Sequence, residues 1–356
     1  MTKQFTQIVL LIQEARGKAI SAVNTELINV YWKVGAYISL QLQQAVWGEK
    51  TVTELAAYIK KSHPEIKGFE RRGLYRMKQF YETYAGTAVV SSMTVQMQTA
   101  GNESDKIVSS LMTQLDLSRQ RDCLLTKISW THHLVIMSRC ASNEERLFYI
   151  ERAIKEAYSV RELERQINSG IYERSLSGIQ VSPALKAKQS EIAGIFKDNY
   201  VFEFLNINDP IKESELQQAL ISQMKAFVLE LGRDFLFVSE EFKLQVGKSD
   251  FFIDLLFYHR GLQCLVAFEL KADKFRPEHL GQLNFYLEAL DRDVKKKHEN
   301  PSIGILLCKG KDAEVVEYAL SRNLSPAMVA EYTMHLPDKA LLQKKLHSIF
   351  EDNLEL

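Results

Sequence analysis

The sequence has few cysteines and no long apolar run, and both absences exclude classes of protein. The four cysteines, Cys123, Cys140, Cys264 and Cys308, lie far apart and form no Cys-x-x-Cys pair, so the pattern indicates neither a zinc site nor a disulfide framework. No stretch approaches the roughly eighteen apolar residues that a membrane span needs, and no apolar segment follows a basic leader at the N-terminus. We therefore expect a protein of the reducing cytoplasm that does not bind a membrane.

The chain also lacks net charge. Its 45 Lys and Arg balance 45 Asp and Glu, which argues against a protein that coats nucleic acid indiscriminately. The charges are unevenly distributed: residues 1–175 hold 23 basic against 18 acidic side chains, and the remaining residues hold 22 against 27. A basic first half and an acidic second half are compatible with a polyanion contact in the one and metal-binding carboxylates in the other.

A length of 356 residues exceeds the usual size of one core and favours at least two domains. Apolar residues recur at three- and four-residue spacing through much of residues 1–175, which predicts an all-α domain. Residues 86–122 lose this periodicity and are rich in Ser, Thr, Gln and Gly, so we expect a flexible excursion there. A linker over 176–189 then leads to a second, α/β domain at 190–356, and the expected fold class is α+β multidomain.

Within the helical domain, the segment EKTVTELAAYIKKSHPEIKGFERRGLYRMKQFYETY predicts a helix, a turn with glycine, and a second helix from near Phe69. This is the outline of a helix-turn-helix, whose second helix would contact DNA phosphates or base edges. The candidate DNA-binding residues are Lys67, Arg71, Arg72, Tyr75, Arg76 and Lys78. A solvated helix face is the open alternative, because the same outline occurs in proteins that bind no DNA.

Four strand-like runs mark the second domain: FLFVSEEFKLQV, DFFIDLLFYH, LQCLVAFELK and SIGILLCK. Helical sequence precedes the first run, and the helical PEHLGQLNFYLEALD separates the third from the fourth. This order predicts an α/β domain with a mixed central sheet. Apolar residues occupy both alternating faces of the third run, so we expect the sheet to be covered on both sides.

Three charged residues interrupt the second and third runs, and a charge inside an apolar strand needs a partner or a function. Side chains alternate along a strand, so Glu269 and Lys271 share one face. If the two runs form an antiparallel hairpin that turns at Gly261, Asp254 lies beside Glu269. Two adjacent carboxylates repel, and a divalent cation between them relieves the repulsion, while the lysine would orient a metal-bound water for attack on a phosphodiester. The open alternatives are a structural ion pair across the strands, and Asp250 in place of Asp254 as the acid.

The order IDLLF followed by ELK resembles the PD-(D/E)XK nuclease superfamily, although Ile253 stands where that pattern has proline. Gln282 and Tyr286 in the following helix match the QxxxY spacing of its RecB-like branch. Nearly the whole chain, moreover, resembles the YhcG family of bacterial proteins, through VNTELINVYWKVGAYI, GFERRGLYRMKQFYETY, ISWTHHLVIMSR, SVRELERQI and DFFIDLLFYHRGLQCLVAFELK. That family pairs an all-helical N-terminal domain with a C-terminal nuclease domain of restriction-endonuclease-like fold.

The resemblance implies a role for each matched residue. Asp254 and Glu269 would hold Mg²⁺ or Mn²⁺, with the carbonyl of Leu270 as a further ligand. Lys271 would be the catalytic lysine, and the QxxxY pair would position DNA or the metal site, completing the catalytic set.

One departure from the family pattern concerns the helix ahead of the sheet. That helix usually offers a glutamate to the metal, and this chain has Gln217 at the corresponding position. Glu213 and Glu215 are close in sequence, but we expect both to project in other directions.

The expected function is therefore metal-dependent endonucleolytic cleavage of DNA in a bacterial defence, mobile-element or DNA-processing context. A homodimer is expected because two cuts on antiparallel strands favour two-fold symmetry. Two alternatives stay open. One is a DNA-binding module of the same fold with weak or no activity, as Gln217 would suggest. The other is a structural subunit of a defence or mobile-element complex that binds protein through its N-terminal helices.

Overall fold

The computed structural model describes residues 2–44, 46–85, 124–176, 180–187, 192, 195–207 and 211–338. It divides into two compact units, Met1–Ile167 and Asn168–Leu356, which are considered separately below. The division falls upstream of residue 175, where the sequence predicts the end of the first domain. The predicted flexible excursion at 86–122 lies outside the described residues, as does part of the predicted linker. No helix in the described ranges is long and apolar enough to cross a membrane.

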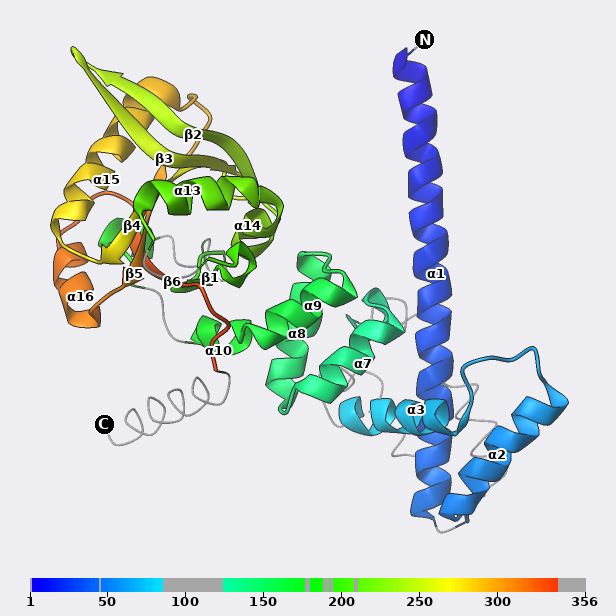
Figure 1. Cartoon of the computed structure of the whole chain (residues 1–356). Helices are drawn as coiled ribbons and strands as arrows, with labels where there is room; N and C mark the ends of the chain where they lie inside the picture. Colours follow the sequence, from blue (N-terminus) through cyan, green and yellow to red (C-terminus); the bar gives the residue numbers. More distant parts are fainter. Residues whose placement is uncertain are drawn as a thin grey trace. The chain divides into compact units, whose positions relative to one another are not determined.

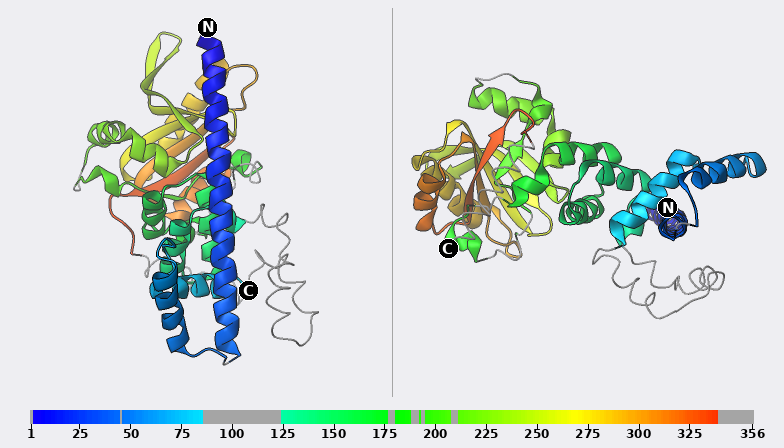
Figure 2. Two further views of the ribbon diagram at one scale, coloured as in Figure 1. Left: turned by 90° about the vertical axis from the view of Figure 1, so that its right-hand side faces the viewer. Right: turned by 90° about the horizontal axis from the view of Figure 1, so that it is seen from below.

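Unit 1 is helical, as predicted (Figure 1). Its elements are α1 Thr2–Gln43, α2 Glu49–Ser62, α3 Arg71–Tyr84, a 3₁₀ turn η1 Leu124–Lys127, α7 Trp130–Arg139, α8 Asn143–Lys155 and α9 Val160–Asn168. The helix-turn-helix outline corresponds to α2 and α3. Two views at right angles show α3 crossing the C-terminal half of α1, while the N-terminal part of α1 extends past the other helices of the unit (Figure 2).

Helix α3 packs on α1 through one buried stripe, Leu74, Met77, Phe80 and Tyr84, at the three- and four-residue spacing of a helix face. The two backbones approach closely at Gly35. A Cβ atom added there would lie 2.1 Å from the carbonyl oxygen of Met77, so only glycine permits this contact.

Replacing Gly35 with alanine is therefore expected to destabilise unit 1 by about 2 kcal/mol or more, because the added methyl forces the two backbones apart. Gly17→Ala in the same helix is the matched control. No described heavy atom lies within 4 Å of a Cβ at Gly17, so that change should be neutral or stabilising by up to about 1 kcal/mol. Thermal unfolding of the full chain measures both, and equal stabilities would contradict the close approach of α1 and α3.

Unit 2 is an α/β domain. Its helical elements are α10 Ile171–Leu176, α11 Pro183–Lys186, η2 Glu203–Leu205, α13 Glu213–Ser222, α14 Met224–Leu231, α15 Glu278–Ala289, a π turn η3 Leu290–Val294 and α16 Ala313–Ser321. Its strands are β1 Asn199–Val201, β2 Phe235–Val246, β3 Ser249–His259, β4 Cys264–Lys274, β5 Ile303–Gly310 and β6 Ala327–Thr333. The sequence predicts β2 to β5 and misses β1 and β6.

The six strands form one sheet in the order β1-β6-β5-β4-β3-β2. Strands β2, β3 and β4 pair antiparallel, whereas β4, β5, β6 and β1 pair parallel. This confirms the prediction of a mixed central sheet.

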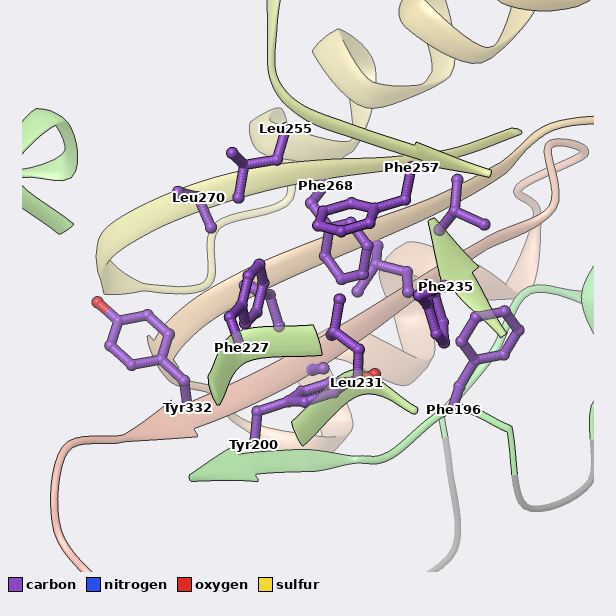
Figure 3. Close-up of a cluster of buried hydrophobic side chains, with 14 of the residues drawn as sticks. Phe196, Tyr200, Phe227, Leu231, Phe235, Leu255, Phe257, Phe268, Leu270 and Tyr332 are labelled. Atoms are coloured by element: carbon purple, nitrogen blue, oxygen red, sulfur yellow. The ribbon is translucent and has the colours of Figure 1, made fainter. Parts of the chain in front are cut away.

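Helices cover both faces of the sheet, as the apolar third run predicts. On one face, Phe227 and Leu231 of α14 pack against Phe257 and Phe268 in an aromatic-rich core (Figure 3). On the other face, side chains of α15 and α16 such as Leu283 pack against the alternate residues of β4 and β5. Phe268 and Leu270 belong to the first core, so the intervening Glu269 lies on the other side of the strand.

A buried ion cluster explains why unit 2 begins before residue 175. Glu230 of α14 has no exposed side-chain surface, and its Oε1 lies 3.2 Å from Arg174 of α10 and 3.1 Å from Lys197. The same oxygen accepts a hydrogen bond from the amide of Val201 in β1. These contacts attach α10 to the sheet of unit 2.

Candidate active site

The predicted acidic pair lies where β3 and β4 separate. Their backbone register runs from His259↔Cys264 to Leu255↔Phe268, and Asp254 and Glu269 are the next residues on each strand. Beyond that point, Asp254 Oδ2 accepts a hydrogen bond of 2.7 Å from the amide of Leu270. The predicted hairpin therefore brings the two carboxylates to neighbouring positions.

Lys271 completes the cluster predicted from the strands. Its Nζ lies 3.0 Å from Glu269 Oε1 and its side chain is 13% exposed. The hydroxyl of Tyr332 donates a hydrogen bond to the carbonyl of Lys271, which fixes the backbone at this point of β4. The side chain of Glu269 is 2% exposed, and its second oxygen, Oε2, is buried without a hydrogen-bond partner among the described residues.

Burial and mutual repulsion shift the protonation equilibria of these residues. The pKa of Glu269 is raised to about 7. Burial is the largest cause and the charge of Asp254 is the second, while Lys271 opposes the shift. Burial also raises the pKa of Asp254, opposed by its hydrogen bond from Leu270 and by Lys271. For Lys271, burial is the largest single effect and lowers the pKa, but the charge and hydrogen bond of Glu269 together with the charges of Glu213 and Asp254 outweigh it, so the net shift is upward. One lysine thus compensates two buried acids only in part.

These features fit a divalent cation. A buried carboxylate oxygen without a partner, beside a second carboxylate, is a donor set that Mg²⁺ prefers, since this ion is commonly held by one or two carboxylates and keeps several waters. The described ranges contain no group of three or more His, Cys, Asp or Glu placed to hold a metal. A cation here would therefore take its other ligands from the backbone, water or substrate.

Helix α13 contacts the cluster at two positions. Gln217 is 9% exposed, and its Nε2 donates a hydrogen bond of 2.9 Å to the carbonyl of Asp254. Glu213, one turn earlier, places Oε2 3.3 Å from Lys271 Nζ. The expectation that Glu213 projects elsewhere is wrong, because residues four apart share a helix face. Glu215 does point away, and its carboxylate accepts from the amide of Lys212.

The QxxxY pair lies on α15. Gln282 Nε2 donates a hydrogen bond of 2.7 Å to the hydroxyl of Tyr286, as the four-residue spacing predicts. Burial raises the pKa of Tyr286, the hydrogen bond from Gln282 opposes this shift, and the charges of Glu269 and Asp254 add to it. His279 lies one turn before Gln282, and its Nδ1 accepts a hydrogen bond from the amide of Arg276. Burial, followed by the charges of Lys271 and Arg276, lowers the pKa of His279.

Asp250, the alternative acid, is engaged elsewhere. Its carboxylate lies 2.8 Å from Lys243 on the neighbouring strand, and both side chains are about half exposed. The geometry therefore favours Asp254 over Asp250 as the acid beside Glu269.

The predicted DNA-binding residues belong to unit 1. Lys67, Arg71 and Arg72 are exposed at the turn and the start of α3, whereas the other three candidates are partly buried. The guanidinium of Arg71 lies 5.5 Å from the ring centre of Tyr75, and Lys78 forms an ion pair of 2.8 Å with Glu82. Three of the six predicted DNA-binding residues are therefore exposed, and the other three are partly exposed.

Two family models match the chain and together span most of both units. A model described as the YhcG PDDEXK nuclease domain matches residues 193–347, and one described as the DUF1016 N-terminal domain matches residues 7–174. The Escherichia coli (strain K12) protein named "Putative nuclease YhcG" is 30% identical over 352 residues, which cover 95% of this chain and 92% of that protein.

Two solved structures show a weaker similarity. A repair endonuclease from Pyrococcus abyssi matches 37% of this chain and 50% of its own, with 19% identity and a TM-score of 0.25. The structure of EndoMS in apo form matches 37% and 49%, with 16% identity and a TM-score of 0.23. The match spans about half the length of each structure, and TM-scores this low carry no conclusion about this chain.

Proposed function

The chain belongs to the YhcG family, and on that premise we propose that it is a bacterial, cytoplasmic DNA endonuclease that requires Mg²⁺ or Mn²⁺. The observation that carries the proposal is the buried pair of Asp254 and Glu269, with one carboxylate oxygen unpartnered among the described residues and Lys271 3.0 Å from the other. Metal-dependent DNA cleavage by the purified chain, stopped by EDTA, is the direct test.

The residues of the site suggest how hydrolysis would proceed. Asp254, Glu269 and the carbonyl of Leu270 would hold the cation, which when bound supplies an activated water and offsets charge on the phosphate. Lys271 would orient that water and stabilise the developing negative charge. Gln282 and Tyr286, linked by their hydrogen bond, would position the DNA backbone beside the strands.

A catalytically inactive DNA-binding module is the second candidate, favoured by one observation. The amide of Gln217 on α13 donates a hydrogen bond to the main chain of Asp254, so α13 offers no carboxylate at this position. An inactive module would bind DNA equally well with and without metal and would cleave none under any condition.

We propose that the start of α3 contacts DNA phosphates through its exposed basic residues. Arg71→Ala combined with Arg72→Ala is expected to weaken DNA binding by a similar factor on all sequences. The slope of log affinity against log salt should fall by about 0.9 for each DNA phosphate that the variant no longer neutralises. Lys18→Ala is the matched control, because Lys18 is an exposed cation of the same unit that pairs with Glu14. Equal salt slopes for all three proteins would contradict this assignment.

An exposed apolar stripe on α1 favours the homodimer. Thr25, Ile28 and Asn29 are buried, while Val23 and Leu27 on another face are 61% and 44% exposed. Helical spacing adds Ile20 to this stripe and, beyond Arg16, which interrupts it, Ile12, Val9 and Phe5. Exposed apolar patches of this kind mark association surfaces, and a two-fold axis would bury the same stripe of two copies.

The defence or mobile-element context stays a prediction of the sequence.

Ile20→Glu is expected to convert the dimer to a monomer in sedimentation velocity of the full chain, since it places a charge in the stripe. Leu11→Glu is the matched control: Leu11 is also exposed, but nine residues separate it from Ile20, which places it on the opposite side of the helix. A monomeric wild-type chain, or equal effects of the two variants, would contradict the stripe as a dimer surface.

A further inference from the structure

Lys271 is held between two carboxylates that come from different elements. Its Nζ lies 3.0 Å from Oε1 of Glu269 in the same strand and 3.3 Å from Oε2 of Glu213 in α13. The two acids differ in environment, since the side chain of Glu269 is 2% exposed and that of Glu213 is 48% exposed. The lysine therefore has one buried and one solvated acceptor.

The contact with Glu269 conflicts with metal binding. The proposed function assigns the carboxylate of Glu269 to a divalent cation, and an ammonium 3.0 Å from that carboxylate would repel the incoming ion at short range. In the metal-free site Lys271 partly takes the place of the cation. Binding of the cation requires the ammonium to give up Glu269 while staying close enough to orient the attacking water.

Glu213 is placed to accept the displaced ammonium. Leu216 and Leu220 of α13 are fully buried in the core, and Gln217 anchors the helix to the carbonyl of Asp254. Glu213 thus projects from a helix whose position relative to the acidic pair is fixed, and its carboxylate already contacts Lys271.

We propose that Glu213 is a positioning residue: its carboxylate holds the ammonium of Lys271 when Glu269 binds a divalent cation. The cation can then enter while the lysine stays in the site. This inference rests on the proposed function. It concerns a residue outside the PD-(D/E)XK motif, and it gives a role to an acid on α13 other than the position occupied by Gln217.

The test is Mn²⁺ binding to the full chain, measured by calorimetry without DNA. Glu213→Gln is expected to weaken Mn²⁺ binding about tenfold, because Lys271 then has only Glu269 as acceptor and competes with the ion. Glu241→Gln is the matched control: the charge of the exposed Glu241 also acts on Asp254, but no ion pair with Lys271 is present among the described contacts. It should weaken binding less than threefold.

A double variant distinguishes an effect of Glu213 on the position of Lys271 from a direct effect of the Glu213 charge on the ion. In a Lys271→Met background, Glu213→Gln should change Mn²⁺ affinity no more than Glu241→Gln does, because no ammonium is left to reposition. An undiminished tenfold loss in that background would overturn the inference, since Glu213 would then act directly on the ion.

The remaining outcomes distinguish this inference from the proposed function. If the wild-type chain binds Mn²⁺ and Glu213→Gln binds it equally well, the role of Glu213 is refuted while the metal site stands. If the wild-type chain binds no Mn²⁺ or Mg²⁺, the proposed function fails and the inference fails with it.

Discussion

Replacing Lys271 with alanine is expected to lower the rate of metal-dependent DNA cleavage by about 100-fold or more, the loss typical for a group that stabilises charge in a transition state. Lys271 contacts the acidic pair, with its Nζ 3.0 Å from Glu269, and under the proposed function its removal leaves the attacking water without this partner. The measurement is the initial rate of plasmid nicking with Mn²⁺ at saturating protein.

Lys274→Ala is the matched control for that experiment, because Lys274 is exposed at the end of the same strand. It should cleave within about threefold of the wild-type rate, since surface substitutions usually have small effects. The Lys271 variant should keep its circular dichroism spectrum and much of its DNA affinity. Unchanged cleavage by Lys271→Ala would contradict the assignment of the site.

Replacing Glu269 with glutamine is expected to abolish stabilisation of the protein by Mn²⁺. A ligand at 100 times its dissociation constant stabilises the folded state by about 2.7 kcal/mol, so Mn²⁺ should raise the melting temperature of the wild-type chain. The variant keeps the size of the side chain but loses the charge to which the proposed function assigns the ion, and its melting temperature should not respond. Glu278→Gln, which changes an exposed acid of α15, should respond like the wild type.

The same substitution predicts a difference in pH dependence without metal. The pKa of Glu269 is about 7 in the folded chain against an ordinary 4.5, so folding favours the protonated carboxyl. Its contribution to stability is complete below pH 4.5 and is lost as the pH rises through 7, a loss of roughly 3 kcal/mol. Chemical unfolding from pH 4.5 to 8 should show this decline in the wild-type chain and a much smaller one in Glu269→Gln. Equal declines would indicate that Glu269 titrates normally.

Short-range patterns predicted the central pair of the site. The turn at Gly261 fixes the hairpin register, and that register brings Asp254 beside Glu269. Helical spacing likewise predicted the contact between Gln282 and Tyr286. In both cases the residues that meet lie on one local element or one hairpin, where the geometry follows from the period of the strand or helix.

Contacts between elements that lie far apart in the chain could not be predicted from the period of a strand or helix. Strand β1 pairs in parallel with β6, far away in the chain, and β6 pairs in parallel with β5 through a helical crossover, and no turn signal marks such pairing. The position of α13 over the end of β4 depends on how its buried leucines pack in the core, so the contact of Glu213 with Lys271 required the structure. The i, i+4 relation of Glu213 to Gln217 was available from the sequence and could have suggested that both face the site.

The most direct test of a metal-dependent nuclease is a cleavage assay on supercoiled plasmid and single-stranded DNA, with Mg²⁺, Mn²⁺ or EDTA, comparing the wild-type chain with Glu269→Ala. We expect cleavage by the wild type with either metal, none with EDTA, and none by the variant under any condition. Absence of cleavage by the wild type on both substrates with both metals would contradict the account and favour the DNA-binding module. Cleavage by Glu269→Ala at the wild-type rate would contradict the assignment of the site.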